Sequence, residues 1–181
     1  MLKKVWDIYK IQFIVTLTLT VVIVSTKIIK TPTYISLAAL GAFLGTFVLE
    51  LDYFVYAYFL EPEKSFSITL RGFMQHKDLG GALNHMYFNK EEVKEKTLNS
   101  VLFQIALAGA SIFVASSSTN LFLKSFVLSI FANSIYKMAD YYFDNKSDQW
   151  FWALKKVPNE NGILIYGVMM VLVLVYSLTL L

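Results

Sequence analysis

Cysteine is absent from this chain of 181 residues, and the chain has only one arginine and two histidines. Without cysteine there is no disulfide, no thiolate metal ligand and no cysteine nucleophile, and the redox compartment cannot be inferred. Prolines are few, and two of the three, Pro32 and Pro62, mark turns between apolar segments. No Gly-x-x-x-x-Gly-Lys pattern occurs, which excludes a nucleotide-binding phosphate loop of that type.

Charge is also scarce, because charged residues make up 16% of the chain against about 25% in ordinary soluble domains. Apolar residues make up 56%, and several uncharged runs approach or exceed the roughly 20 residues that a helix needs to cross a bilayer. These runs are continuous and do not alternate as the strands of a membrane barrel would. The predicted fold class is all-α, a polytopic membrane helix bundle in a single transmembrane domain, residues 1–181. About five transmembrane helices are predicted, at about 8–29, 34–60, 98–115, 121–143 and 163–181.

The distribution of lysine and arginine predicts how these helices are oriented. With the N-terminus inside, the basic residues lie on or near the cytoplasmic face, except for Lys27, Lys30 and Lys124. Cytoplasmic loops of membrane proteins carry such an excess of positive charge. We therefore expect an N-inside, C-outside, multi-pass protein of the cell's inner (plasma) membrane, with a cytoplasmic loop at 61–96. The lipid bilayer is its expected partner, and no nucleic acid is expected, because the basic residues follow the membrane segments.

Two carboxylates, Glu50 and Asp52, lie near the end of the second predicted helix. A carboxylate inside a membrane segment is costly unless it is paired, hydrated or bound to a cation. Helical spacing places Asp52 on the face of Gly41 and Gly45, a GxxxG pair typical of close helix packing, and turns Glu50 almost the opposite way. We expect Glu50 to be solvated at the interface and Asp52 to face the bundle. Both carboxylates reach one site only if the helix loosens near its end.

A polar stripe runs along the fourth predicted helix at four-, three- and four-residue spacing: Ser129, Asn133, Tyr136 and Asp140. Such a stripe on an otherwise apolar helix should face protein or water and not lipid. The predicted topology puts Asp140 at the depth of Asp52, so we expect the two to meet. Either a metal ion binds them, or a structural salt bridge or hydrogen bond to Lys137, Asn99 or Arg71 satisfies them, and the sequence leaves both readings open.

The candidate metal ligands are the acidic residues at this depth and the two histidines of the 61–96 loop: Glu50, Asp52, His76, His85 and Asp140. Carboxylates favour Mg²⁺, and imidazoles would add selectivity for Zn²⁺, so a divalent metal is the candidate cofactor. The alternative for each histidine is plain solvation in a polar loop. No catalytic residue is assigned. The charged segment 90–96 is expected to be a solvated start of the third helix, and Tyr53 to be an aromatic residue of the membrane interface.

Three segments resemble the membrane-bound metal-dependent hydrolase family that includes LexA-binding inner-membrane proteins. The glycine-rich segment 41–45 leads into Glu50-Leu51-Asp52-Tyr53, which is similar to that family's Asp-x-Asp-His motif. Segment 70–76, Leu-Arg-Gly-Phe-Met-Gln-His, resembles its His-Arg-Gly-x-x-His segment, and segment 134–140 resembles its late helical element. The resemblance implies a metal site at the cytoplasmic face of the membrane.

The chain departs from this pattern where such relatives have histidine: Tyr53, Leu70, Asn99 and Ser134. Loss of these imidazoles leaves an oxygen-rich site suited to Mg²⁺, Ca²⁺ or no metal. The sequence thus favours a non-catalytic membrane subunit or scaffold, related to the hydrolases, that binds a protein partner through loop 61–96. The alternative is an active metal-dependent hydrolase in which metal-bound water attacks a phosphoester or similar bond. A small ion or proton transporter is the weaker third hypothesis, because no repeated half is present.

Overall fold

The computed structural model describes residues 2–26, 31–93, 96–154 and 156–181, with the backbone alone at 2–5, 7 and 91. Within these ranges the chain is all-α, as predicted, and contains no strand. The helices lie in this order: α1 (Leu2–Thr26), α2 (Pro32–Val48), α3 (Leu51–Val55), the π-helical turn η1 (Tyr56–Leu60), α4 (Ser65–Gln75), α5 (Leu79–Phe88), the short 3₁₀ turn η2 (Lys90–Glu92), α6 (Val101–Ser117), α7 (Leu121–Phe143), α8 (Ser147–Trp150) and α9 (Glu160–Thr179).

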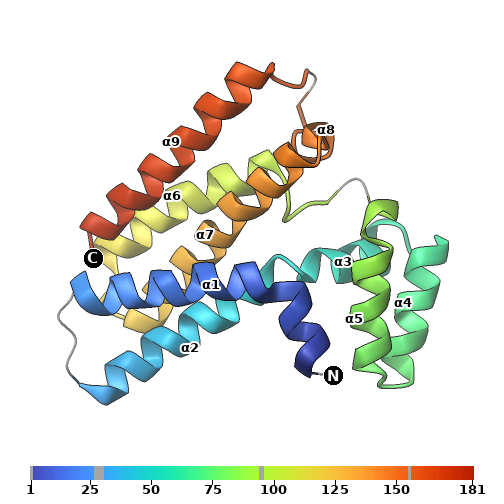
Figure 1. Cartoon of the computed structure of the whole chain (residues 1–181), viewed down its shortest axis with the longest axis horizontal. Coiled ribbons are helices and arrows are strands. Elements are labelled where there is room, and N and C mark those ends of the chain that lie inside the picture. Colours follow the sequence, from blue (N-terminus) through green and yellow to red (C-terminus); the bar gives the residue numbers. More distant parts are fainter. Residues whose placement is uncertain (1, 27–30, 94–95, 155) are drawn as a thin grey trace.

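The long helices form a bundle around α7, which contacts α1, α2, α6 and α9 (Figure 1). Three helices are long and apolar enough to cross a membrane: Ile8–Thr26, Leu121–Phe143 and Glu160–Thr179. A fourth candidate arises if α2 and the segment 51–60, which meet at an angle of 42°, count as one span. The predicted span at 98–115 corresponds to α6, a shorter apolar helix of 17 residues. The architecture is therefore a helical bundle with three to four candidate membrane-spanning helices among the described residues.

The GxxxG pair brings α2 and α7 into direct backbone contact, as its spacing predicts. A Cβ atom added at Gly45 would lie 2.6 Å from the carbonyl oxygen of Phe126, and one added at Gly41 would collide with the carbonyl of Phe122. Only glycine lets two helices approach this closely. Packing is therefore the role of these two glycines.

The second predicted helix is not continuous over 34–60, and this part of the prediction is wrong. It ends at Val48, turns through Leu49 and Glu50, and resumes at Leu51. The turn closes with a hydrogen bond from the Glu50 N–H to the Phe47 carbonyl, 3.0 Å long. Periodicity does not reveal this break because no proline or glycine marks it. It changes the direction in which both carboxylates point.

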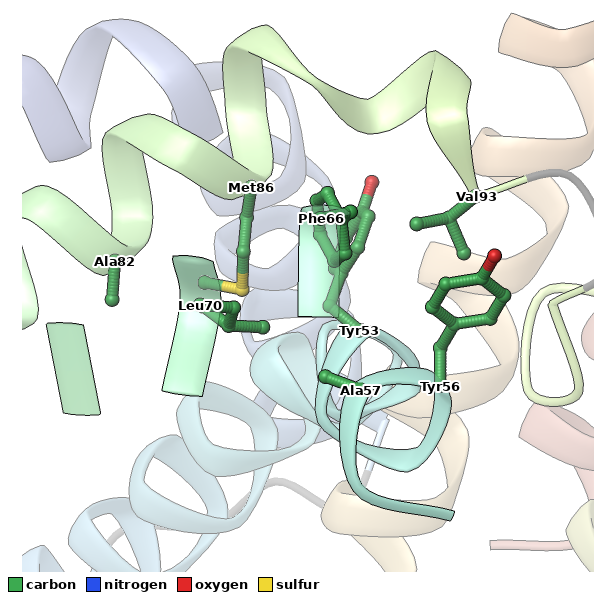
Figure 2. Close-up of a cluster of buried hydrophobic side chains, with 8 residues drawn as sticks. All are labelled: Tyr53, Tyr56, Ala57, Phe66, Leu70, Ala82, Met86 and Val93. Atoms are coloured by element: carbon green, nitrogen blue, oxygen red, sulfur yellow. The ribbon is translucent and has the colours of Figure 1, made fainter. Parts of the chain in front are cut away.

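The segment 61–96 is not a polar loop but largely a helical hairpin of α4 and α5. Each helix of the hairpin presents an apolar face, because its buried apolar residues lie four positions apart. These are Phe66 and Leu70 in α4, and Ala82 and Met86 in α5. These faces form a second core with the end of the broken helix (Figure 2), which consists of Tyr53, Tyr56, Ala57, Phe66, Leu70, Ala82, Met86 and Val93. The Asp78 carboxylate caps α5 by accepting a hydrogen bond from the Gly81 N–H, 2.8 Å away. The hairpin is thus fixed to one end of the bundle.

Candidate functional site

A pocket of about 280 Å³ opens where α1, the broken second helix, the segment 86–99 and the end of α7 meet. Its described lining combines five lysines with three carboxylates and five tyrosines. The charged members are Lys10, Lys90, Lys96, Lys137, Lys146, Glu50, Asp140 and Asp144. So dense a set of charges beside apolar helices makes this pocket the candidate functional site.

Glu50 forms an ion pair with Lys137 at this pocket, with 2.7 Å between the carboxylate Oε1 and the lysine Nζ. Their side chains are only 13% and 12% exposed. The expectation that Glu50 is simply solvated at the interface is therefore wrong, because the break after Val48 turns its side chain toward α7. Lys137 therefore neutralises Glu50, whereas the sequence predicted that it would neutralise Asp52 or Asp140.

Asp52 is fully buried and holds the chain that leads into α6. Its carboxylate accepts three hydrogen bonds: from the Thr97 N–H at 2.9 Å, the Asn99 N–H at 2.8 Å and the Asn99 side-chain amide at 2.9 Å. The same Asn99 amide donates to the Leu49 carbonyl, which the helix break leaves without a helical partner. Asp52 faces the interior, as expected, and of its two partners Asn99 is one of the expected alternatives, while Thr97 is not. It is not one of the residues that line the pocket.

The other candidate ligands are distributed over separate surroundings. Asp140 lines the pocket, and its carboxylate has no hydrogen bond or ion pair with another described residue. The His85 ring stacks on Phe66, with centroids 4.7 Å apart, and its Nε2 donates to the Phe66 carbonyl at 3.0 Å. His76 is exposed at the end of α4. Within the described part of the chain, no three histidine or acidic side chains come together as metal ligands would.

The polar stripe of α7 faces protein and pocket, as predicted from its spacing. Ser129 and Asn133 are fully buried. The Ser129 hydroxyl donates to the Ala42 carbonyl at 2.7 Å, and the Asn133 amide donates to the Thr16 hydroxyl at 3.1 Å. The next two members of the stripe, Tyr136 and Asp140, line the pocket. The stripe thus continues from the interior of the bundle into the candidate site.

Lys96 is the pocket residue that the sequence reasoning missed, and it is buried where a solvated residue was expected. Its ammonium group donates to the hydroxyl of Tyr141 at 2.8 Å and to that of Tyr53 at 3.3 Å. The same nitrogen lies 4.8 Å from the centre of the Tyr53 ring, within cation–π range. Burial, reinforced by the positive charge of Lys137, lowers the pKa of Lys96 from 10.5 to about 8. No sequence signal separates this lysine from its charged neighbours in 90–96.

The Lys96 segment is fixed from two further directions. The Trp152 indole N–H donates to the Lys96 carbonyl at 2.9 Å, and Val93 inserts into the second core. Val93 and Lys96 are therefore docked against the rest of the chain, and α6 begins only at Val101. The prediction of a solvated, helical 90–96 start is wrong for Val93 and Lys96, which are buried, whereas Glu92 is exposed and residues 94 and 95 lie outside the described ranges.

The pocket therefore contains the Glu50–Lys137 and Asp144–Lys146 pairs together with further lysines, and it lies beside the buried Asp52 carboxylate that anchors the start of α6. The pocket lies next to helices of membrane-spanning character, and its tyrosines and lysines come from segments far apart in the sequence. Compared with known proteins, the chain matches no protein family, no curated protein and no solved structure.

Proposed function

We propose that this chain is a non-catalytic membrane subunit or scaffold, in which the bundle is the frame and the α4–α5 hairpin binds a protein partner. The buried Asp52 carboxylate carries this proposal. All its observed hydrogen bonds come from Thr97 and Asn99, so it joins the broken helix to the start of α6. A carboxylate held this way by three N–H donors stabilises a fold and offers little to a metal ion.

The proposal includes five spans, with the N-terminus in the cytoplasm of a cell whose inner (plasma) membrane holds the protein. Three helices reach spanning length unaided, and the bent pair of α2 with 51–60 supplies a fourth. The 17 residues of α6 fall at the short end of the range of about 17 to 25 for a membrane helix. Alternation of five spans places the α4–α5 hairpin in the cytoplasm, beside most of the lysines.

The resemblance to metal-dependent hydrolases belongs to the same proposal. In this proposal the chain keeps the helix bundle of that family, while its acidic residues bind other side chains and backbone groups of the protein. Asp52 binds Asn99, and Glu50 binds Lys137. Both Asn99 and Tyr53 stand where the resemblance implies histidine in active relatives. A degenerate relative that holds its bundle together with former ligand positions accounts for these contacts.

The test compares Asp52→Asn with Asp148→Asn, an exposed acidic residue of α8. An amide at position 52 turns a donor toward N–H groups, so we expect a loss of about 2–4 kcal/mol in the free energy of unfolding. Asp148→Asn should change it by less than about 0.5 kcal/mol. Unfolding in detergent micelles by added dodecyl sulfate measures both. Elemental analysis that finds stoichiometric Mg²⁺ or Zn²⁺, lost in Asp52→Asn, would support the active hydrolase instead.

A second arm tests the partner. The chain lacks cysteine, so Phe88→Cys on the exposed side of α5 gives a single cross-linking site, and Val168→Cys on α9 gives a matched site of membrane-helix character. We expect one defined protein adduct in native membranes from position 88 and none from 168. Equal cross-linking at both positions, or at neither, contradicts the assignment of the hairpin as the docking element.

A further inference from the structure

Three hydrogen-bond donors on residues that line the pocket have no acceptor among the described residues. The Lys96 ammonium has three N–H bonds, and two of them are directed to the hydroxyl oxygens of Tyr53 and Tyr141. Each hydroxyl accepts from Lys96 and therefore keeps its own O–H as a donor. Neither O–H has an acceptor among the described residues. One N–H and two O–H groups are thus free to bind the same anion.

The charges around this cluster favour an anion over a cation. Two of the three pocket carboxylates are already neutralised, because Glu50 pairs with Lys137 and Asp144 lies 3.6 Å from Lys146. Asp140 is the third. The lining also contains three further lysines, Lys96, Lys10 and Lys90, which outnumber this one carboxylate. The described lining is therefore positive overall.

We propose that this pocket binds a phosphate group through Lys96, Tyr53 and Tyr141. A phosphate has several acceptor oxygens in a tetrahedral arrangement, so it can take one N–H and two O–H donors together. Two further lysines of the lining, Lys10 and Lys90, would balance the remaining negative charge of the phosphate. The pocket, at about 280 Å³, approaches the roughly 300 Å³ at which ligand pockets begin, and it holds a phosphate with a few further atoms.

Two sources offer this chemistry: the headgroup of an anionic phospholipid and a free phosphate or phosphate monoester. Basic pockets between membrane helices bind lipid headgroups in membrane proteins. Phosphate binding requires only the pocket and its donors, so it stands apart from the scaffold role. A failure of the Asp52→Asn test would leave it unaffected.

The experiment is calorimetric titration of the purified full chain in detergent with dioctanoyl phosphatidic acid and, separately, with inorganic phosphate. We expect the acidic lipid to bind and dioctanoyl phosphatidylcholine to bind at least about tenfold more weakly. Lys96→Gln should remove binding, whereas Lys64→Gln, an exposed lysine paired with Glu61, should leave it unchanged. Binding of phosphatidic acid without competition by inorganic phosphate identifies the lipid headgroup as the source. Equal binding of inorganic phosphate identifies the free anion.

Because Lys96 is buried, its substitution can also disturb folding, and a second variant resolves this. The double variant Tyr53→Phe and Tyr141→Phe keeps both rings and removes only the two hydroxyl donors. Figure 2 shows the Tyr53 ring beside Phe66, a contact that the variant preserves. We expect native helix content by circular dichroism and at least about tenfold weaker phosphatidic acid binding, as two lost hydrogen bonds imply. Undiminished binding in this variant, or no binding of either probe to the parent chain, overturns the proposal.

Discussion

At the scale of single residues, the same side-chain type has different roles according to what long-range packing places beside it. Asp52 and Glu50 are two positions apart, yet one accepts backbone N–H groups and the other pairs with a lysine 87 residues later. Lys96 is a cation buried between two tyrosines, while Lys64 is exposed on the hairpin. Burial is what separates these roles, because it makes each unmet charge or hydrogen bond costly.

Lys96 predicts how stability depends on pH. Its pKa is lowered from 10.5 to about 8 by burial and by Lys137, so the folded state releases the proton before the unfolded state does. The cost of the buried charge is therefore fully present below pH 8 and is relieved between pH 8 and 10.5. The free energy of unfolding should rise across this interval. The charged groups that act on Lys96 are Lys137 on α7, Lys90 on η2, and Glu50 and Asp52 at the helix break.

Dodecyl sulfate unfolding at pH 7.5, 8.5 and 9.5 or thereabouts measures this rise. Lys96→Met should remove most of it, since the variant has no charge to release at this position. Lys64→Met serves as the control, and its curve should follow that of the parent chain. A parent curve that falls from about pH 7.5 to 8.5, below the range in which tyrosines ionise in the unfolded chain, would mean that Lys96 is stabilised as a cation, contrary to its burial.

At the scale of elements, the sequence placed the long helices well and missed what interrupts them. Apolar runs and the polar stripe of α7 are local patterns, and periodicity reads them directly. The break at Leu49 is not local, because the Asn99 amide that satisfies its carbonyl lies 50 residues away. The α4–α5 hairpin was not predicted either, because it too depends on contacts between segments far apart in the sequence. Its apolar faces are short, and they become a core only against Tyr53 and Tyr56.

The candidate site follows the same division. The sequence identified Glu50 and Asp140, which do line one pocket, because charges in apolar runs are conspicuous. It could not identify the Glu50–Lys137 pair or the Lys96 cluster, because these depend on which segments meet in space. Asp52 was identified as important, and its hydrogen bond with Asn99 is one of the expected alternatives, whereas the bond from the Thr97 N–H was not foreseen.

The contact between α2 and α7 gives a prediction at this scale. Gly45→Ala places a methyl group 2.6 Å from the Phe126 carbonyl, so the helices must separate, and we expect a loss of about 1–3 kcal/mol in the free energy of unfolding. Gly109→Ala in α6 is the matched control, because a Cβ atom there meets nothing within 4 Å. Alanine favours a helix by up to about 1 kcal/mol over glycine, so the control should be neutral or more stable. Equal effects of both substitutions would show that close packing at Gly45 is unimportant.

At the scale of the whole molecule, the arrangement has a heavily covered centre and an apolar exterior. Over half of the apolar window of α7 is buried, 56%, against 17% for α9. An apolar helix with so much exposed surface fits a lipid environment and not water. The α4–α5 hairpin lies toward one end of this bundle, so a membrane orientation decides which compartment it meets (Figure 1).

Cysteine labelling tests the orientation, and the natural lack of cysteine makes each variant a single reporter. With the N-terminus in the cytoplasm, Lys64→Cys before α4 should react with a membrane-impermeant maleimide only in inverted vesicles. Ser118→Cys, in the turn between α6 and α7, should react only in right-side-out vesicles. Labelling of both positions from the same side would mean that α6 does not cross the membrane, and would reduce the number of spans.

The Glu50–Lys137 pair also has a consequence for how the protein is made. A ribosome adds about 5–20 residues per second, so roughly 4 to 17 s pass between synthesis of the glutamate and of the lysine, 87 residues later. Throughout that interval α1 and α2 exist without the helix that carries the countercharge and without the surface that receives Gly41 and Gly45. The nascent chain must keep this carboxylate hydrated or shielded until α7 emerges, and a product that stops before residue 137 never acquires its partner.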